Sequence, residues 1–439
     1  MSVADKHQVI VVGGGAGGLE LATRIGGKFG RRQAEVTLID VSPTHIWKPL
    51  LHDVAAGTLD ANVDALEYLA QARWHRFRFR LGRMEGLDRK KCEVYVAPTY
   101  DDKGVEAIPR RSFHYDTLVI AVGSVSNDFG VKGVQEHCLF LDTTEQAELF
   151  RRRMLGAVVR AQAKGGPQTL AELHVVIVGG GATGSELAAQ LHHVAYQLSA
   201  YGLDQIVPER DIKISLLEAA DRILPVLPPR LSAAAEAQLA RLGIAVHVSE
   251  RVVEVTAQGV RTQSGKFIPT GITVWAAGIK APDFLKALDG LETTRLNQLV
   301  VGRTLQTTRD DAVFAFGDCA ACPLDDNQDR IVPPRAQAAH QQASLLVRSL
   351  RNRFRGRPLA HYVYRDYGSL VALGKYSTVG SLMNRLFRGS IMIEGVIARL
   401  VYLSLYKMHQ VALFGWYRVV LLTLANLLRR RVYPEIKLH

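Results

Sequence analysis

Short runs of β-branched and aliphatic residues form the clearest hydrophobic pattern in this chain. Four of them predict buried strands: Val9–Val12, Glu35–Ile39, Val175–Val178 and Ile212–Leu217. Such apolar runs are typical of parallel strands that are covered on both faces. The first and third runs each lead directly into a glycine-rich stretch and then into a helix-forming sequence. We therefore expect two strand–turn–helix units in an α/β fold with two Rossmann-like domains.

Both glycine-rich stretches have the spacing G-x-G-x-x-G, and the second begins 166 residues after the first. The first glycine makes a tight turn, the second lets the backbone approach a pyrophosphate, and the third lets the helix pack closely on the strand. The helix N-terminus then presents N–H groups to the phosphates. Two such turns predict FAD and a nicotinamide nucleotide held face to face. The predicted pyrophosphate-binding residues are Gly13, Gly15, Gly17 and Gly18 in the first turn and Gly179, Gly181, Thr183 and Gly184 in the second.

An acidic residue closes the strand that follows each turn. Asp40 lies 22 residues after Gly18, where a ribose-binding carboxylate is expected. Glu218 lies 34 residues after Gly184, which is about a dozen residues further than this pattern requires. We interpret residues 197–210 as an inserted loop or a helix extension. The alternative is that both turns are purely structural and the acids are incidental.

The assignment of cofactors to the turns depends on the residues downstream. The strand-like run 312–316 ends in Gly317-Asp318, and in two-dinucleotide flavoproteins such an aspartate accepts hydrogen bonds from the flavin ribityl chain. The segments Thr117–Gly123 and Thr273–Gly278 are expected to carry the chain from the FAD domain into the NAD domain and back. No arginine directly follows Glu218, whose charge would repel a 2′-phosphate, so the second turn favours NADH over NADPH.

The length of 439 residues allows about three domains, and an apolar content of 48% is enough for sizeable cores. We predict a discontinuous FAD-binding domain over residues 7–125 and 295–380, an NADH-binding domain over 126–294, and a C-terminal membrane-association region over 381–439. The polar N-terminus contains no signal peptide, so we expect a protein that faces the cytosol.

The four cysteines are too few for a disulfide framework in a chain of this length. Cys319 and Cys322 form a C-x-x-C pair, which is compatible with a redox disulfide, with half of a zinc site, or with packing. No second cysteine or histidine pair stands at zinc-binding spacing, and the segments where related disulfide reductases carry their cysteines contain none. We expect the two thiols to be packed at the start of a helix after Asp318, and we expect no metal site.

Much of the net charge of +12 is concentrated near the C-terminus. Residues 385–439 contain nine Lys/Arg and two Asp/Glu among many apolar and aromatic side chains. This composition favours an amphipathic helix lying in the membrane interface, with Trp416 and Tyr417 at headgroup depth and the arginines 429–431 on anionic lipid. A transmembrane span over Val411–Leu428 is the rival, although Arg418 would lie near its centre. A buried interface of a homodimer is the third interpretation.

A second basic stretch, Arg73–Arg83, also contains aromatic residues and raises the question of nucleic-acid binding. Phe77, Phe79 and Leu81 alternate with arginines, which is the period of a half-buried strand with a solvated face. We expect such a strand and no nucleic-acid partner.

A pair of glutamines follows Asp318. Pro333 and Pro334 precede an expected helix near Arg335, and Gln337 and Gln341 would share one face of it. Two amides beside small alanines are suited to hydrogen-bonding the oxygens of a quinone. Two ordinary surface glutamines on a helix would give the same spacing.

Together these motifs resemble those of the type II, non-proton-pumping NADH:quinone oxidoreductases of bacteria. The resemblance covers nearly the whole chain and includes the run 335–341, which is similar to the family's quinone motif A-Q-x-A-x-Q, the loop Ile46–His52, Trp275–Pro282 and Gly368–Leu370. It implies non-covalent FAD, NADH as substrate, quinone as acceptor, and peripheral attachment to the cytoplasmic face of the cell membrane. It implies roles for Glu186 beside the nicotinamide and for Gln337 and Gln341 at the quinone. The further cofactor-binding residues that we predict are Lys48, Pro49, Met84, Gly123, Ala277 and Gly278.

Three functions remain open from the sequence. The first is the quinone reductase, the second a soluble flavoprotein that passes electrons to a disulfide or a redox protein, and the third a membrane-tethered redox sensor without turnover.

Overall fold

The chain folds as two units, and each is built around a parallel sheet with a glycine-rich turn at its centre. The computed structural model describes residues 6–200, 202, 205–325, 330–373, 377–384 and 389–429. Unit 1 comprises residues 1–47, 65–125 and 279–366, and unit 2 comprises residues 48–64, 126–278 and 367–439. The α/β class expected from the sequence is confirmed.

Unit 1 contains a six-stranded sheet in the order β23-β24-β11-β1-β2-β5. Its strands are parallel except for the edge strand β23. The bounds are β1 His7–Val12, β2 Ala34–Asp40, β5 Arg78–Leu81, β11 Thr117–Ile120, β23 Gln306–Thr307 and β24 Asp310–Ala315. The central strand β1 is fully enclosed because its last four residues, all Val or Ile, are at most 3% exposed. This matches the apolar pattern that predicted it.

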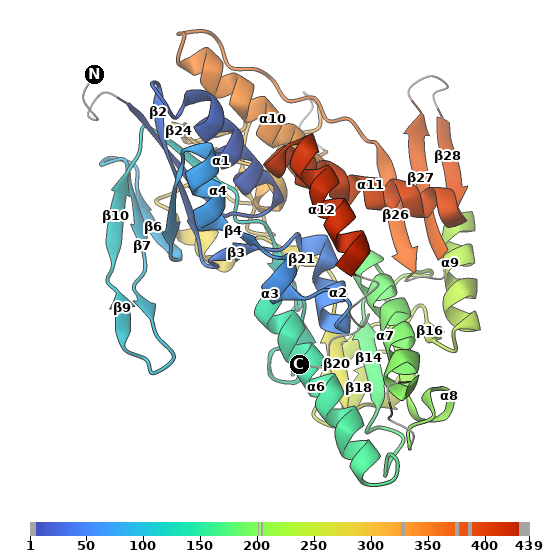
Figure 1. The fold of residues 1–439 in the computed structure, drawn as a ribbon. Helices are drawn as coiled ribbons and strands as arrows, with labels where there is room; N and C mark the ends of the chain where they lie inside the picture. Colours follow the sequence, from blue (N-terminus) through green and yellow to red (C-terminus); the bar gives the residue numbers. More distant parts are fainter. Residues whose placement is uncertain are drawn as a thin grey trace. The chain divides into compact units, whose positions relative to one another are not determined.

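Three helices accompany this sheet: α1 Ala16–Phe29, α4 Tyr68–His75 and α10 Ala336–Arg353. Helices α1 and α10 lie side by side (Figure 1). The smaller strands of unit 1 are β3 Thr44–His45, β4 Leu66–Glu67, β6 Met84–Asp88, β7 Glu93–Val96, β8 Thr99–Tyr100, β9 Glu106–Ile108, β10 Arg111–His114, β22 Leu299–Val300 and β25 Ala320–Ala321, with 3₁₀ turns at Asp283–Ala287 and Gly317–Cys319. The expected helix near Arg335 is confirmed, with Arg335 as the residue before its first turn.

Unit 2 contains a five-stranded parallel sheet in the order β13-β20-β14-β15-β16. The strands are β13 Cys138–Phe140, β14 His174–Val178, β15 Lys213–Leu217, β16 Ala245–His247 and β20 Ile272–Trp275. The helices are α2 Leu51–Ala56, α3 Ala61–Asp64, α5 Val134–His137, α6 Thr144–Ala163, α7 Ala182–Ala200, α8 Pro208–Asp211 and α9 Pro229–Arg241, with a 3₁₀ turn at Lys48–Leu50. A separate antiparallel sheet is formed by β17 Val252–Thr256, β18 Gly259–Thr262 and β19 Phe267–Pro269.

The insertion expected between Gly184 and Glu218 is a helix extension followed by a short second helix. Helix α7 continues to Ala200, and α8 then precedes β15. Asp211, the last residue of this second helix, accepts a hydrogen bond from the backbone N–H of Val207, which precedes the helix, at 2.8 Å. The extra residues therefore lengthen the connection without changing the strand order.

The chain leaves unit 1 between Val125 and Ser126 and returns between Gly278 and Ile279. The short strands β12 Val125–Ser126 and β21 Ile279–Lys280 stand at these two crossings. The segment of residues 48–64 belongs to unit 2 because its helix α2 packs against α6 and α7. The functional domain bounds given above stay a prediction.

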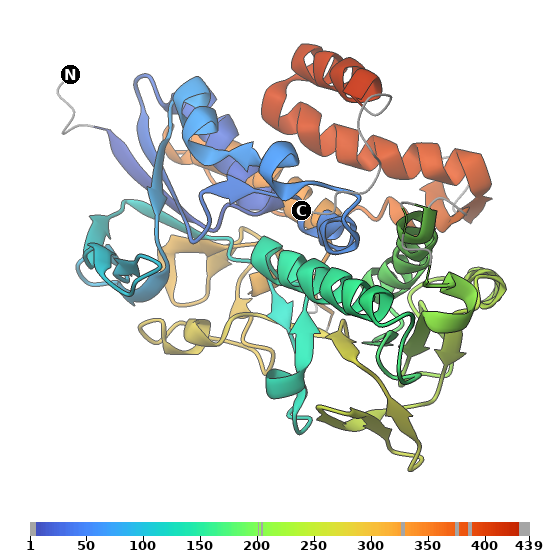
Figure 2. The same cartoon turned by 60° about the horizontal axis from the view of Figure 1, so that its bottom comes forward.

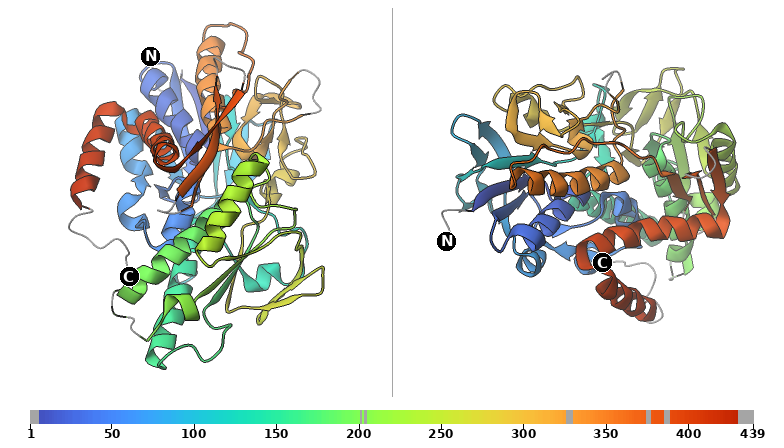
Figure 3. Two further views of the ribbon diagram at one scale, coloured as in Figure 1. Left: turned by 90° about the vertical axis from the view of Figure 1, so that its right-hand side faces the viewer. Right: turned by 90° about the horizontal axis from the view of Figure 1, so that it is seen from above.

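The C-terminal part of unit 2 contains an antiparallel sheet and two helices. The sheet consists of β26 Gly368–Leu373, β27 Ser377–Asn384 and β28 Gly389–Glu394, and β27 packs against α9 (Figure 3). Helices α11 Gly395–Phe414 and α12 Trp416–Arg429 are separated at Gly415, and α12 folds back beside α11 (Figure 2). Within the described part of the chain, no helix has the length and hydropathy that a membrane crossing requires. The rival span over Val411–Leu428 is therefore wrong, because Gly415, with φ of 79°, interrupts it.

The basic stretch near residue 78 is the half-buried edge strand that its period predicted. Phe77 and Phe79 are 6% and 7% exposed, whereas Arg78 and Arg80 lie on the solvated face.

Candidate functional site

The first glycine-rich turn connects β1 to α1 and can be made only by glycines at two positions. Gly13 has φ of 99°, and a Cβ on it would overlap the carbonyl of Ala121, which follows β11. A Cβ on Gly18 would overlap the carbonyl oxygen of Gly13. Gly15 differs, because no heavy atom lies within 4 Å of the position that its Cβ would take. The turn is therefore tightly packed against the sheet, whereas the space beside Gly15 is empty. A pyrophosphate could approach the backbone closely at this position.

Asp40, at the end of β2, holds the middle of this turn. Its Oδ2 accepts a hydrogen bond from the Gly14 N–H at 2.5 Å, and its Oδ1 accepts one from Ser42 N–H at 2.8 Å. The Tyr68 hydroxyl donates to the Gly14 carbonyl at 2.7 Å. His45 also contacts the Gly14 backbone. Gly14 is therefore held by one carboxylate and two further side chains.

The tyrosine and the histidine at this turn are both uncharged near neutral pH. Burial raises the pKa of Tyr68 well above its usual value, and the charge of Asp40 adds to the effect. Burial lowers the pKa of His45 to about 4, with a smaller contribution in the same direction from His340. Neither residue was predicted from the sequence, because neither stands at a recognisable spacing from the glycines.

Asp318 lies at the carboxyl end of β24, after Gly317, whose φ is 74°. The Ser124 hydroxyl donates to Asp318 Oδ2 at 2.8 Å, and Gln298 Nε2 donates to the Asp318 carbonyl at 3.1 Å. Buried Gln342 on α10 accepts a hydrogen bond from Gly317 N–H at 2.9 Å. Two side chains therefore hold Asp318 and a third holds the preceding Gly317, at the same sheet edge as the first turn.

Three other predicted residues of unit 1 are Gly123, Met84 and Gly17. Gly123 follows β11 with φ of 70° and has open space around its Cβ position. Met84, the first residue of β6, is 3% exposed. Gly17 is buried on α1, where a Cβ would overlap the ring of Phe316.

The second turn repeats the construction of the first. Gly179 has φ of 111° and meets the backbone of Ala276 and Ala277, which follow β20. A Cβ on Gly184 would overlap the carbonyl oxygen of Gly179, and Gly181 has no heavy atom within 4 Å of its Cβ position. The predicted residue Thr183 is exposed in the first turn of α7.

Glu218 has the same place in unit 2 as Asp40 has in unit 1. Its Oε2 accepts a hydrogen bond from Gly180 N–H at 2.7 Å, and its Oε1 accepts one from Ala220 N–H at 2.8 Å. Gly278, with φ of 63°, lies against the ring of Phe129. The structure thus brings the turn at residues 179–184, Glu218 and Ala277 together at one sheet edge.

Glu186 lies on α7 and is 6% exposed. Its Oε1 accepts a hydrogen bond from the backbone N–H of Ala372 at 2.9 Å, and its Oε2 lies 3.6 Å from Nδ1 of buried His52. His52 Nε2 is in turn 3.6 Å from Asp53 Oδ2. His52 belongs to the loop Ile46–His52, which resembles the family, but its contact with Glu186 was not predicted from the sequence.

Lys48 and Pro49 are both exposed. The Lys48 ammonium pairs with Asp142 at 3.1 Å, and the other Asp142 oxygen accepts a hydrogen bond from Ser126 N–H at 2.9 Å. This contact fixes the start of α2 within unit 2.

The two glutamines of α10 both contact the segment that leads to β26. Gln341 exchanges two hydrogen bonds with the backbone of Arg365, donating from Nε2 at 2.7 Å and accepting at Oε1 at 3.0 Å. Gln337 donates to Asp366 at 3.2 Å, and Asp366 also pairs with Arg335 at 3.1 Å. The structure places both amides on one face of the helix, as the spacing indicated, and their binding of quinone stays a prediction.

The C-x-x-C cysteines are buried in the core of unit 1, and both are free thiols. Cys319 ends a 3₁₀ turn, which is followed by the strand β25 rather than by the helix that we expected. Burial raises the pKa of both thiols to about 12, so thiolate is scarce at neutral pH. Among the residues that the structure describes, no group of three or more His, Cys, Asp or Glu side chains is arranged to hold a metal ion.

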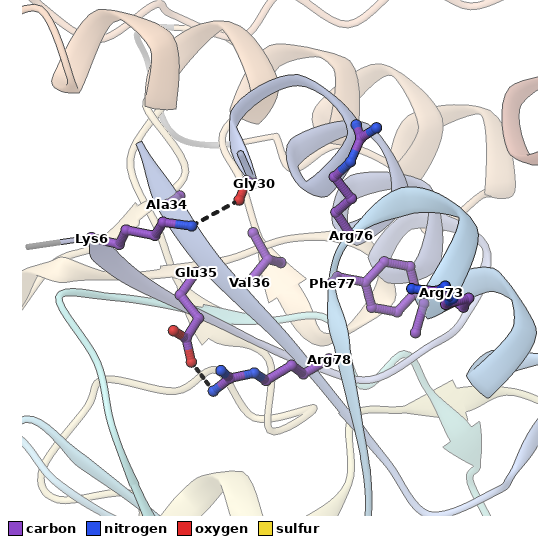
Figure 4. A pocket seen from close by; sticks show the side chains of 10 residues that line it. Lys6, Gly30, Ala34, Glu35, Val36, Arg73, Arg76, Phe77 and Arg78 are labelled. Atoms are coloured by element: carbon purple, nitrogen blue, oxygen red, sulfur yellow. Dashed lines mark hydrogen bonds and ion pairs between the residues drawn. The ribbon is translucent and has the colours of Figure 1, made fainter. Parts of the chain in front are cut away.

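A hollow of about 330 Å³ opens beside the edge strand β5 (Figure 4). Three of its polar side chains have partners at the hollow, since Lys6 donates to the Gly30 carbonyl at 3.2 Å and Arg78 pairs with Glu35. None of the predicted site residues lines it. The hollow is therefore separate from the glycine-rich turns.

Residues 7–343 match a family described as pyridine nucleotide-disulphide oxidoreductase. The chain is also 42% identical to a type II NADH:quinone oxidoreductase of Haemophilus influenzae, over 98% of this chain and 99% of that enzyme. The chain belongs to the type II NADH:quinone oxidoreductase family. Another member, the enzyme NdhA of Mycobacterium tuberculosis, is 28% identical over 94% of this chain.

The fold of this family member is also found in solved structures. NDH2 of Plasmodium falciparum in complex with NADH superposes with a TM-score of 0.80, covering 98% of this chain and 100% of that protein at 19% identity. The sulfide:quinone oxidoreductase of Aquifex aeolicus gives a TM-score of 0.71 at 18% identity, over 93% of this chain and 92% of that protein. At such identities the similarity concerns the fold alone.

Proposed function

We propose that this protein oxidises NADH through a non-covalent FAD and passes the electrons to a membrane quinone. Membership of the type II NADH:quinone oxidoreductase family supports the reaction. The cofactor assignment rests on a glycine-rich turn that occurs once in each unit and that we call a cradle. In each cradle, the acid at the end of the next strand, Asp40 or Glu218, binds the backbone of a glycine in the turn. Two cradles fit two dinucleotides.

We assign FAD to unit 1. Gly13, Gly15 and Gly18 would hold its pyrophosphate, Asp40 its ribose, and Asp318 its ribityl chain. The room at Gly15 and the rigid placement of Asp318 by Ser124 and Gln298 fit such a ligand. When bound, the flavin supplies the capacity to accept a hydride and to release electrons, and the protein supplies orientation and electrostatics.

NADH is assigned to the turn of unit 2. The carboxylate of Glu218 would accept hydrogen bonds from the adenosine ribose hydroxyls and repel the 2′-phosphate of NADPH. Glu186 lies one helical turn beyond Thr183, and it would orient the nicotinamide amide or its ribose. In the structure, Glu186 is itself held by the backbone of Ala372.

Quinone is assigned to the amides of Gln337 and Gln341. These amides already have partners, Asp366 and the backbone of Arg365 respectively. Quinone binding would therefore exchange these hydrogen bonds for bonds to the quinone oxygens, so that the segment at residues 365–366 competes with the substrate.

We further propose that α12 attaches the protein to the cytoplasmic face of the cell membrane. Trp416 is 72% exposed and Leu428 is 68% exposed, whereas Val419 is 5% exposed. A helix with a broad exposed apolar face and basic residues is suited to the interface of an anionic bilayer. Of the arginines expected on lipid, 430 and 431 lie outside the described residues. The homodimer stays an open alternative for this face.

The quinone assignment is tested by separating the two half-reactions. Gln341→Ala is expected to slow reoxidation of the NADH-reduced flavin by quinone while leaving flavin reduction by NADH unchanged. Gln306→Ala, which alters another amide of unit 1 that pairs with Asp311, is the control and should change neither step. Equal losses in both half-reactions of Gln341→Ala would contradict the assignment.

A further inference from the structure

A partly buried pair of ionisable side chains joins α1 to α10, the helices that carry the proposed FAD-binding glycines and the proposed quinone-binding glutamines. Glu20 lies on α1, two residues after Gly18, and its side chain is 5% exposed. His340 lies on α10, and its Nδ1 is 2.5 Å from Glu20 Oε2. Neither residue takes part in the dinucleotide and quinone contacts proposed above. A buried carboxylate in the middle of a helix requires a partner, because burying an unpaired charge is costly.

The second oxygen of Glu20 has a partner of its own. Arg24 Nη1 lies 2.6 Å from Glu20 Oε1 and donates to the Ser344 hydroxyl at 2.6 Å. The guanidinium therefore balances the charge of the carboxylate permanently. As a result, His340 can be neutral or protonated while Glu20 stays paired in both states.

Glu20 also determines which nitrogen of His340 exchanges its proton. Because the carboxylate accepts a hydrogen bond from Nδ1, the neutral ring carries its hydrogen there and leaves a lone pair on Nε2. Protonation then adds an N–H at Nε2 alone. The side chain of His340 is 26% exposed, so solvent can replace a proton that Nε2 gives away.

The ionisable groups near His340 are less suited to proton transfer than His340 itself. His45, on β3, feels the charge of His340, but its own pKa of about 4 keeps it neutral near pH 7. On the helix itself, the adjacent Gln337 and Gln341 carry no charge. Three other charged groups on elements near α10 have partners: Glu20 with Arg24, Asp318 with Ser124, and Asp366 with Arg335.

We propose that His340 donates a proton to the quinone during its reduction, with Glu20 as the positioning residue that fixes its tautomer. This inference rests on the proposed quinone site at Gln337 and Gln341. Reduction of a quinone to a quinol consumes two electrons and two protons. The hydride of NADH accounts for two electrons and one proton, so one further proton must come from solution. The Nε2–H bond of His340 breaks as an O–H bond forms on the quinone, and the ring then takes up a proton from solvent.

The test follows the two half-reactions of the FAD-loaded, full-length protein over a range of pH. In the wild type, reoxidation of the flavin by a soluble quinone should slow as pH rises, because the reduction of quinone consumes a proton from solution. His340→Gln should slow this step by about 10²-fold and remove the pH dependence, while flavin reduction by NADH stays unchanged. His7→Gln, which replaces another half-buried histidine of unit 1, should behave as the wild type.

A second variant and a spectroscopic measurement test the pair itself. Glu20→Gln keeps the size of the side chain and should retain flavin, but reoxidation by quinone should slow while flavin reduction by NADH stays unchanged, because a carboxylate no longer fixes the tautomer of His340. In ¹⁵N spectra of the wild type at high pH, the hydrogen of the neutral His340 ring should be on Nδ1. A hydrogen on Nε2 of the neutral ring, or a His340→Gln protein with the wild-type rate and pH profile, would overturn the inference. A wild-type flavin that quinone cannot reoxidise would instead contradict the proposed function.

Discussion

The carboxylate of Asp40 is bonded to the backbone N–H of Gly14, with Oδ2 2.5 Å from the nitrogen. Unit 2 repeats this relationship between Glu218 and Gly180 at 2.7 Å. In each unit the other carboxylate oxygen accepts a hydrogen bond from the residue two positions further along the chain. The acid that is expected to bind the ribose therefore also holds the turn that is expected to bind the pyrophosphate. Each cradle is preorganised by its own strand, which lowers the cost of ordering it on binding.

The open glycines of the two turns offer a matched pair of variants. Because Gly15 and Gly181 have no heavy atom within 4 Å of their Cβ positions, a valine at either place should leave the fold intact. We expect Gly15→Val to lose FAD, and Gly181→Val to keep FAD and weaken NADH binding by about tenfold or more, since a side chain there occupies the space of the pyrophosphate. Flavin absorbance after purification and NADH titration measure the two effects. Loss of flavin from both variants alike would contradict separate sites.

Glu218 should determine the preference for NADH over NADPH. Replacing it with glutamine removes the charge that repels the 2′-phosphate. Glu218→Gln should therefore lower the ratio of kcat/KM for NADH to kcat/KM for NADPH by about tenfold, which corresponds to about 1.4 kcal/mol. Glu254→Gln, which removes a half-buried carboxylate of the same unit paired with Lys132 and Arg261, is the control. An unchanged ratio in Glu218→Gln would show that the carboxylate does not face the ribose.

The sequence was sufficient for the elements whose signal is local. The apolar runs before Gly13 and Gly179 are the central strands β1 and β14, and the alternation around Phe79 is an edge strand. These predictions succeeded because a parallel strand buried on both faces leaves an apolar run, and a half-buried strand leaves a period of two.

The contacts that complete the site depend on side chains far apart in the chain. Tyr68 reaches Gly14 from 54 residues away, and His340 reaches Glu20 from 320 residues away. No spacing pattern encodes such pairs, because they arise only when separate helices pack together. The helix after Asp318 was expected and is absent, since the buried pair Ala320 and Ala321 continues as strand β25 against β22.

His45 should make the stability of the protein depend on pH. Its pKa is about 4 in the folded chain and about 6.5 when unfolded, so the unfolded state binds more protons between these values. The contribution of His45 to the free energy of unfolding is fully present above pH 6.5. It decreases by up to about 3 kcal/mol as pH falls toward 4. His45→Gln should show a smaller loss in urea unfolding between pH 7 and pH 5. An identical loss in both proteins would refute this role.

The exposed leucines of α12 should determine membrane binding. Leu424 and Leu428 are 54% and 68% exposed, so glutamates there should leave the fold intact and release the protein from vesicles that contain anionic lipid. Leu170→Glu alters a leucine of unit 2 that is 79% exposed and lies outside α12, and it should bind as the wild type does. Sedimentation with the vesicles measures the effect. Continued cosedimentation of the Leu424→Glu/Leu428→Glu protein would exclude α12 as the anchor.

The central claim is that two cradles bring NADH and a flavin into one reaction that ends at a quinone. Anaerobic absorbance spectra of the purified protein, reconstituted with FAD where needed, test it most directly. The oxidised-flavin bands should bleach when NADH is added and return when a soluble quinone follows. A polypeptide that takes up no flavin, or a reduced flavin that stays bleached in the presence of quinone, would contradict the account.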